Sequence, residues 1–187
     1  MSQLQHKTMT PTEFLAWEAK QESKWEFDGF QPVAMNGVTV AHSVIQGNLT
    51  TMLNNRLRGK RCRPYGPDLK IEIGSKYRYP DAFVSCTPAS RSASVAGEPV
   101  VIFEVLSEST AVTDRTTKLM EYRSLPSLKR YVLLEQSASV ATVITRSETG
   151  WSIEVLDAGG NLLMPEIKIA IAMAELYDGL DFTTLES

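Results

Sequence analysis

Two acidic residues have the types and positions expected of a metal-binding pair. Asp81 follows Pro80 in a segment with the pattern of a strand, and Glu104 interrupts the apolar segment 100–106. An unpaired carboxylate is costly to bury, so such residues usually form ion pairs, become protonated or bind metal. Carboxylates, a backbone carbonyl and water are ligands that Mg²⁺ accepts. We therefore predict that Asp81 and Glu104 bind a divalent ion, with help from the carbonyl of Val105.

A lysine near such an ion would complete a site for phosphodiester hydrolysis. Lys118 lies in the segment 114–123, whose spacing predicts a helix. A lysine beside a bound phosphate orients or deprotonates water and offsets negative charge in the transition state. We predict this role for Lys118.

Simpler interpretations of the same residues stay open. An aspartate after proline often accepts a turn hydrogen bond, which would account for Asp81. Glu104 and Lys118 could form a purely structural ion pair, and Lys118 could pair with Asp114 on a solvated helix face. Metal dependence distinguishes these alternatives from a catalytic site. His42 is predicted to be a capping or packing residue, because a lone histidine usually has that role.

The N-terminal part of the chain has clear signals for a helix and a hairpin. Thr10, Pro11 and Glu13 occupy the cap, first and third positions of a capping box, which predicts a short helix to about residue 20. The segment 24–35 is rich in apolar and aromatic residues and is broken by an Asp-Gly pair at 28–29. This pattern predicts two strands that meet at that pair.

The central part predicts a long helix and a second hairpin. Apolar residues recur every three or four positions over 39–57, and Gly59 follows as a stop signal. The segments 68–73 and 77–85 have extended patterns separated by a turn, so we expect them to pair. The segment 88–97 is small and polar, which predicts a surface loop.

The site residues fall in a predicted strand, helix, strand unit. The strand 100–106 reads as buried on both faces, the helix 114–123 follows it, and 129–135 predicts the next strand. A hairpin is predicted over 141–156, and a short terminal helix over 169–177.

Composition favours one ordinary globular domain over residues 1–187, with 1–9 as a flexible tail. The chain is 43% hydrophobic and 22% charged, and its apolar runs are far shorter than the roughly 20 residues of a membrane-spanning helix. The two cysteines, Cys62 and Cys86, lack the spacing of a zinc site, and we do not expect a disulfide. These features predict a cytoplasmic protein with no membrane partner.

The overall charge argues against a broad basic surface that wraps nucleic acid. The formal net charge is −3 and the pI is near 5.5. A local basic cluster remains a candidate phosphate contact, although charges near a helix end usually form a solvated face. This cluster consists of Arg56, Arg58, Lys60, Arg61 and Arg63.

The chain resembles a known family over nearly its whole length. The resemblance is carried by Tyr79-Pro80-Asp81, by the segment 101–107, by Asp114 with Lys118, and by 122–131. Further similar segments are Trp25-Glu26-Phe27-Asp28-Gly29, Ala41-His42-Ser43 and Glu175-Leu176-Tyr177-Asp178-Gly179. These segments resemble the bacterial Uma-two-type family, a group assigned to the restriction endonucleases within the PD-(D/E)XK superfamily.

The resemblance implies a fold and a set of functional residues. The fold would be α/β (α+β) and restriction-endonuclease-like, with a central mixed β-sheet flanked by helices. Asp81 and Glu104 would hold Mg²⁺ or Mn²⁺, and Glu26 would complete the site. In the superfamily, a lysine stands two positions after the second acid. Leu106 occupies that position here, and the resemblance assigns the role to Lys118 instead.

Two functions follow as hypotheses. The first is a divalent-metal-dependent endonuclease that hydrolyses DNA phosphodiester bonds and acts as a homodimer, because two sites are needed to cut two strands. The alternative is a catalytically inactive nuclease-fold module that acts in nucleic-acid binding or dimerisation. The lysine missing from position 106 and the acidic pI favour this alternative.

Overall fold

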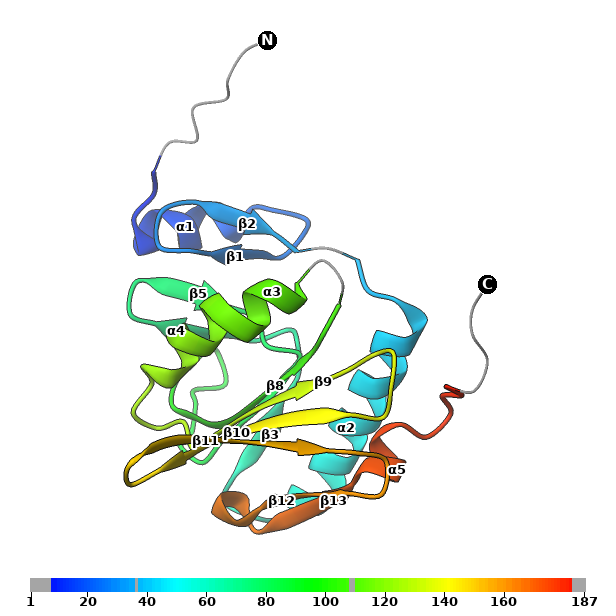
Figure 1. The fold of residues 1–187 in the computed structure, drawn as a ribbon. Coiled ribbons are helices and arrows are strands. Elements are labelled where there is room, and N and C mark those ends of the chain that lie inside the picture. Colours follow the sequence, from blue (N-terminus) through cyan, green and yellow to red (C-terminus); the bar gives the residue numbers. More distant parts are fainter. Residues whose placement is uncertain (1–7, 36, 108–109, 183–187) are drawn as a thin grey trace.

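The fold is built around a six-stranded mixed sheet. A computed structural model describes residues 8–35, 37–107 and 110–182 (Figure 1). The strands of this sheet are β3 (Arg63–Tyr65), β6 (Ala82–Ser85), β8 (Pro99–Val105), β9 (Arg130–Leu134), β10 (Ala141–Ser147) and β11 (Gly150–Leu156). Their order is β11-β10-β9-β8-β6-β3. Only β8 and β9 pair in parallel within it, and the helical segment between them makes the crossover that parallel strands require.

A five-stranded sheet and a separate hairpin complete the β structure. The five strands are β1 (Trp25–Phe27), β2 (Pro32–Ala34), β4 (Lys70–Ile73), β5 (Lys76–Arg78) and β7 (Val95–Ala96). They are arranged in the order β2-β1-β5-β4-β7. The hairpin consists of β12 (Asn161–Met164) and β13 (Ile169–Ala172).

Helices cover both faces of the six-stranded sheet, whereas the first helix packs against the five-stranded sheet (Figure 1). The helices are α1 (Pro11–Glu18), α2 (Val40–Leu57), α3 (Ala111–Thr113), the π-helix η1 (Asp114–Lys118), α4 (Leu119–Arg123), the 3₁₀-helix η2 (Pro165–Ile167) and α5 (Met173–Leu176). One face of β8 packs against α2, with Phe103 beside Leu49 and Leu53 in one buried cluster. The other face packs against α4, with Ile102 and Tyr122 in a second cluster. This is the predicted mixed sheet flanked by helices.

Most local predictions are confirmed. Thr10 forms the predicted capping box with Glu13 at the start of α1. The main helix begins after its N-cap Thr39 and ends before Gly59, whose positive φ of 75° suits glycine. Within the predicted N-terminal tail, residues 1–7 lie outside the described residues. The backbone N–H of Met9 donates to the carbonyl of Phe30.

Three predictions of secondary structure are wrong in part. The segment predicted as one strand over 77–85 divides at Pro80, and its halves, β5 and β6, belong to different sheets. The helix predicted over 169–177 is the strand β13 followed by the short α5. An alternating Ile-Ala segment satisfies either pattern when it is this short, and pairing with β12 decides the outcome. The predicted loop 88–97 contains the short strand β7, which pairs with β4.

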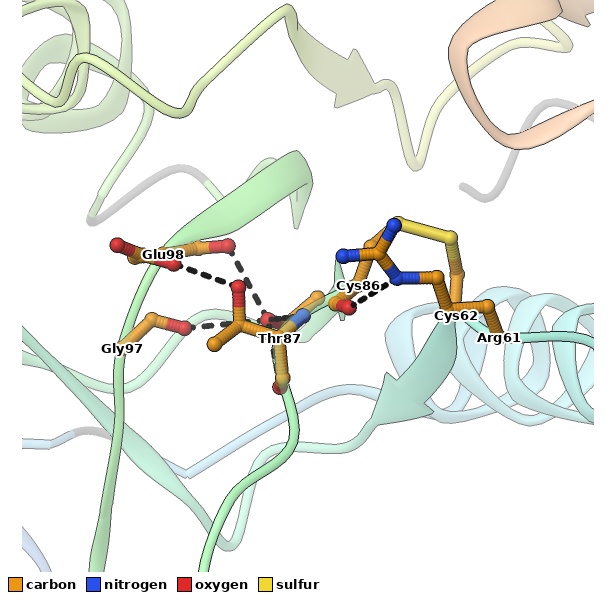
Figure 2. Close-up of a disulfide and its surroundings, with 7 residues drawn as sticks. Arg61, Cys62, Cys86, Thr87, Gly97 and Glu98 are labelled. Carbon is orange, nitrogen blue, oxygen red and sulfur yellow. Dashed lines mark hydrogen bonds between the residues drawn. A yellow bond between two sulfur atoms is a disulfide. The ribbon is translucent and has the colours of Figure 1, made fainter.

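The expectation of no disulfide is also wrong. Cys62 and Cys86 form a disulfide with their Cα atoms 3.9 Å apart (Figure 2). Arg63 of β3 pairs with Ser85 of β6, so continuation of the antiparallel register places the two cysteines opposite each other. The sequence gives no strong strand signal for the three-residue β3, and its pairing with β6 is therefore not visible from cysteine spacing alone.

None of the helices among the described residues is long and apolar enough to cross a membrane.

Candidate active site

The two predicted carboxylates lie on neighbouring strands. β6 and β8 are antiparallel, and Ala82 pairs with Phe103. Asp81 directly precedes β6, so the same register places it opposite Glu104. Directly opposed residues in a ladder have neighbouring side chains on one face of the sheet. Because the chain leaves β5 after Arg78 and enters β6 at Ala82, Asp81 stands just before β6, beside Glu104 of β8.

Three hydrogen bonds hold the Asp81 carboxylate. Oδ2 accepts a hydrogen bond from the backbone N–H of Val105 at 2.7 Å. Oδ1 lies 2.9 Å from Nε2 of His42 and accepts a hydrogen bond from Nε2 of Gln46 at 3.0 Å. His42 and Gln46 are four residues apart in the first turns of α2, so one helix face directs both side chains to the same oxygen. The carboxylate is thus fixed from both the sheet and α2.

Glu104 is buried and is held from the opposite helix. Its Oε1 accepts hydrogen bonds from Nζ of Lys118 at 3.1 Å and from the hydroxyl of Tyr122 at 2.7 Å. Only 3% of Glu104 is exposed. Lys118 and Tyr122 are four residues apart on the helical segment that follows β8, so both reach one carboxylate oxygen.

The ammonium group of Lys118 lies among three carboxylates. Its Nζ is 3.1 Å from Glu104, 3.1 Å from Asp114 and 3.4 Å from Glu26. Asp114 and Lys118 are the first and last residues of the π-helix η1. π-helical turns are rare and often occur at functional sites. An ammonium group carries three N–H donors. The ammonium group of Lys118 is surrounded by three carboxylates.

The pKa values of Glu104 and Lys118 are both raised, but for different reasons. Burial raises the pKa of Glu104 to about 8, although Lys118 opposes this shift, and the neighbouring carboxylates of Asp81, Asp114 and Glu26 add to it. Burial would lower the pKa of Lys118, but Glu104, Glu26 and Asp114 outweigh it, and the pKa is raised. The lysine therefore stays charged while Glu104 takes up a proton more easily than an exposed glutamate.

A second layer of ion pairs holds Glu26. Its Oε2 accepts a hydrogen bond from Arg78 at 3.1 Å, and its Oε1 accepts one from the backbone N–H of Tyr79 at 3.1 Å. Arg78 also makes a two-pronged contact with Glu121, at 2.8 and 2.9 Å. Burial would raise the pKa of Glu121, but hydrogen bonds from Arg78 and Lys76 outweigh it and lower the pKa. Glu26 is thus tied to both the predicted site and this outer pair.

The network has more acidic than basic groups. Five carboxyl groups (Glu26, Asp81, Glu104, Asp114 and Glu121) face three basic side chains (Lys76, Arg78 and Lys118). With all five carboxyl groups ionised and His42 neutral, the formal excess is two negative charges, and a bound cation would favour this ionised form of Glu104. All the donor groups are hard oxygens of the type that Mg²⁺ and Mn²⁺ accept. The residues present therefore fit such an ion.

The predicted ligand set is small. No group of three or more His, Cys, Asp and Glu side chains among the described residues is arranged to hold a metal. The predicted set uses two carboxylates and a backbone carbonyl, and the remaining ligands of a Mg²⁺ ion are usually waters or substrate oxygens.

The structure brings together all the predicted side chains and adds several more. Glu26, Glu104 and Lys118 are in direct contact, and Asp81 is the cross-strand neighbour of Glu104. Sequence reasoning missed the contacts that Gln46, Arg78 and Tyr122 make, and it expected His42 only to cap or pack. For Tyr122, spacing of four from Lys118 was an available signal. The contacts of His42 and Gln46 depend on packing between distant segments, which spacing does not reveal.

The basic cluster is not part of this network. Arg56 pairs with Glu175, and Lys60 donates to the carbonyl of Lys168. Arg61 donates to the carbonyl of Cys86 beside the disulfide (Figure 2). These residues lie around the C-terminal end of α2, whereas His42 and Gln46 lie near its N-terminal end.

Comparison with a solved structure defines the class of fold. A crystal structure from Anabaena variabilis, described as "a putative nuclease belonging to DUF820", superimposes with a TM-score of 0.76. The match covers 90% of this chain and 97% of that chain at 19% sequence identity. At this identity the likeness concerns the fold alone, which this chain shares with that protein over nearly its whole length.

The family follows from sequence comparison. Residues 11–174 match the model of the Uma2 family, described as "Putative restriction endonuclease". The chain belongs to this family. The uncharacterized protein slr1290 of Synechocystis is 34% identical over 178 residues, which cover 93% of this chain and 94% of the relative. The uncharacterized protein sll1609 of the same organism is 28% identical over 135 residues, 70% of this chain and 76% of that one.

Proposed function

We propose that this protein is a divalent-metal-dependent endonuclease that hydrolyses DNA phosphodiester bonds. The observation that carries the proposal is the cross-strand pair Asp81 and Glu104 next to the ammonium group of Lys118. Family membership supports a nuclease-like function. Fold alone does not establish chemistry.

Each residue of the proposed site has a stated role. Asp81 and Glu104 would hold Mg²⁺ or Mn²⁺, with the backbone carbonyl of Val105 as a further ligand. An ion held there would supply Lewis-acid chemistry, namely polarisation of a phosphate and a lower pKa for a bound water. Lys118 orients that water and offsets the negative charge that develops on the phosphate. Glu26 keeps Lys118 in place at 3.4 Å.

The hydrogen-bond partners of Asp81 prepare it for this role. His42, Gln46 and the N–H of Val105 fix the carboxylate in one orientation. A preoriented ligand loses little conformational freedom when it binds an ion, and groups that orient metal ligands commonly affect affinity by about 10–100-fold. Lys118 donates a hydrogen bond to Glu104 and lies within ion-pair distance of Asp114 and Glu26, so its ammonium group is held by charge on three sides.

A second function, in a different class, is a catalytically inactive nuclease-fold module that binds nucleic acid or dimerises. The observation that favours it is the same set of contacts around Lys118, which is also the arrangement of a purely structural ion pair. The lysine position of the superfamily, two residues after Glu104, is occupied by Leu106. The buried Leu106 packs in the apolar cluster with Tyr122.

Metal titration together with plasmid nicking tests the proposal. Mn²⁺ is titrated calorimetrically into the wild type and into Asp81→Ala and Glu104→Ala, and the same samples are assayed on supercoiled DNA. Metal binding and nicking should be lost together in both variants. Glu166→Ala is the matched control, because Glu166 is a paired carboxylate, held by Arg130, outside the site network. A wild type that binds no divalent ion and cuts no DNA would support the inactive module.

The homodimer is also part of the proposal. Cutting both strands of a duplex requires two sites, and two copies of this chain would supply them.

A further inference from the structure

The strand β11 has the features of an unprotected sheet edge. It is the last strand of the six-stranded sheet and pairs with β10 over seven consecutive residues without a bulge. Ile153 and Val155 are 67% and 66% exposed, which is unusual for large apolar side chains on a strand. Proteins usually shorten, charge or kink an exposed edge, because it can pair with another chain.

The opposite edge of the same sheet has these protections. Its edge strand β3 has only three residues. Two of them are Arg63 and Pro64, a charge and a residue that cannot donate to a neighbouring strand. The disulfide Cys62–Cys86 also fixes β3 to β6 (Figure 2). Within this sheet, one edge is therefore blocked, and no strand among residues 8–35, 37–107 and 110–182 pairs with the other edge, β11.

We propose that β11 is the dimerisation edge of this protein and pairs antiparallel with β11 of a second copy. The loop between β10 and β11 has two residues, 148 and 149, and Ser147 pairs with Gly150. The pair that closes a two-residue hairpin is hydrogen-bonded, and bonded pairs then alternate along the ladder. The backbone groups of Trp151, Ile153 and Val155 therefore point to the free edge.

The register of the pairing follows from the strand itself. A two-fold axis at Ile153 sets this residue opposite itself and overlaps the whole of β11. Trp151 then faces Val155 of the second copy, an aromatic and β-branched pair of the kind that stabilises antiparallel sheets. Ser152 faces Glu154, so the two Glu154 carboxylates are not directly opposed. At this register the apolar residues of the strand face one another, and no like charges are directly opposed.

The aromatic end of the strand is held in place before pairing. The guanidinium carbon of Arg146 lies 4.5 Å from the ring centroid of Trp151, and that of Arg123 lies 5.4 Å from it. Arg146 is fixed by hydrogen bonds to the carbonyls of Leu128 and Leu125. A preorganised side chain loses little freedom on association. One pair of strands buries less than the roughly 1,600 Å² of a standard interface, which is typical of weak, reversible association.

The β11 pairing names the interface of the homodimer that is part of the proposed function. It rests on that homodimer and not on the proposed metal site. Sedimentation of the wild type across the micromolar range should show a monomer–dimer equilibrium. The double variant Ile153→Lys with Val155→Lys should remain monomeric and still bind Mn²⁺, which separates failure of the dimer from failure of the metal site. Leu163→Lys is the control, because Leu163 is 61% exposed on β12, outside the six-stranded sheet.

A cysteine scan tests the register. Both native cysteines are in the disulfide, so a single introduced cysteine supplies the free thiol. Ile153→Cys should be cross-linked into a dimer by a short bifunctional thiol reagent, and Glu154→Cys much less efficiently. A wild type that stays monomeric at every concentration, or a lysine variant that still dimerises, would overturn the proposal. Equal cross-linking at both positions would overturn the register.

Discussion

Replacement of Lys118 by methionine tests whether its ammonium group stabilises the carboxylate cluster. The substitution keeps an apolar chain of similar length but leaves three acidic groups without their shared cation. Glu26 retains Arg78, and Glu104 can accept a proton because burial raises its pKa to about 8. Asp114 is affected most, because it is 1% exposed and Lys118 is the cation in contact with it among the described residues.

The magnitude of the effect follows from that loss. Removing one partner of a buried ion pair costs about 3–5 kcal/mol, and we expect about 3 kcal/mol at pH 8, since Glu104 can be neutralised. A buried carboxyl group without a cation favours the protonated form in the folded state. Stability of the variant should therefore fall as pH rises, and its deficit should shrink at pH 5. Urea unfolding followed by circular dichroism at both pH values measures the deficit.

Lys76→Met is the matched control for this experiment. The Lys76 side chain is 32% exposed, and its partner Glu121 keeps two hydrogen bonds from Arg78. Such a pair contributes about 0–1 kcal/mol, so this variant should unfold close to the wild type. If Lys118→Met were as stable as Lys76→Met at pH 8, or if its deficit were the same at pH 5, the electrostatic account of the cluster would be refuted.

Three further predictions concern the metal ligands and the disulfide. Affinity for Mn²⁺ should rise about tenfold per pH unit up to about pH 8 and then level off, because binding must displace the proton from Glu104. Calorimetric titration with Mn²⁺ over this pH range measures the affinity. His42→Ala should weaken Mn²⁺ binding about tenfold, because Asp81 loses one of its orienting contacts; the same titration at one pH measures it. Reduction of the Cys62–Cys86 disulfide should lower the free energy of unfolding by about 3 kcal/mol, as expected for a bridge between cysteines 24 positions apart. Urea unfolding with and without reductant measures this difference.

Each of these predictions has a contrary outcome. Mn²⁺ affinity that is independent of pH would mean that Glu104 does not bind the ion as a carboxylate. Unchanged affinity in His42→Ala, with Gln46→Ala also unchanged, would show that neither contact orients Asp81. The reduced protein should unfold like the double variant Cys62→Ser with Cys86→Ser, and identical stability of the oxidised and reduced forms would contradict the third prediction.

The sequence was sufficient to predict the central elements and the proximity of the main site residues. Glu104 is conspicuous because it interrupts a run of buried apolar residues, and such a contrast is visible in a sequence. The predicted strand, helix, strand unit around Lys118 corresponds to β8, the helical segment and β9. The structure confirms these placements, whereas the catalytic roles stay proposals.

Other features depend on pairing between distant segments and were not predictable in this way. Strands of three residues, such as β3, give too little alternation to be recognised, and the disulfide depends on one of them. The contact of His42 with Asp81 joins a helix and a strand end 39 residues apart. The salt-bridge layer of Arg78, Glu26 and Glu121 requires β1, β5 and α4 to meet, which no local pattern specifies.

The disulfide also changes the covalent topology around the site. Residues 62–86 form a closed ring of chain, and Asp81 lies within that ring. Trypsin cleavage after Lys76, the partly exposed first residue of β5 that follows the turn at 74–75, would cut the backbone without separating the two pieces. The Asp81 carboxylate would thus remain covalently attached to α2 as well as to β8 after a cut in its own loop. A nicked protein would migrate as one band under non-reducing conditions and as two bands after reduction.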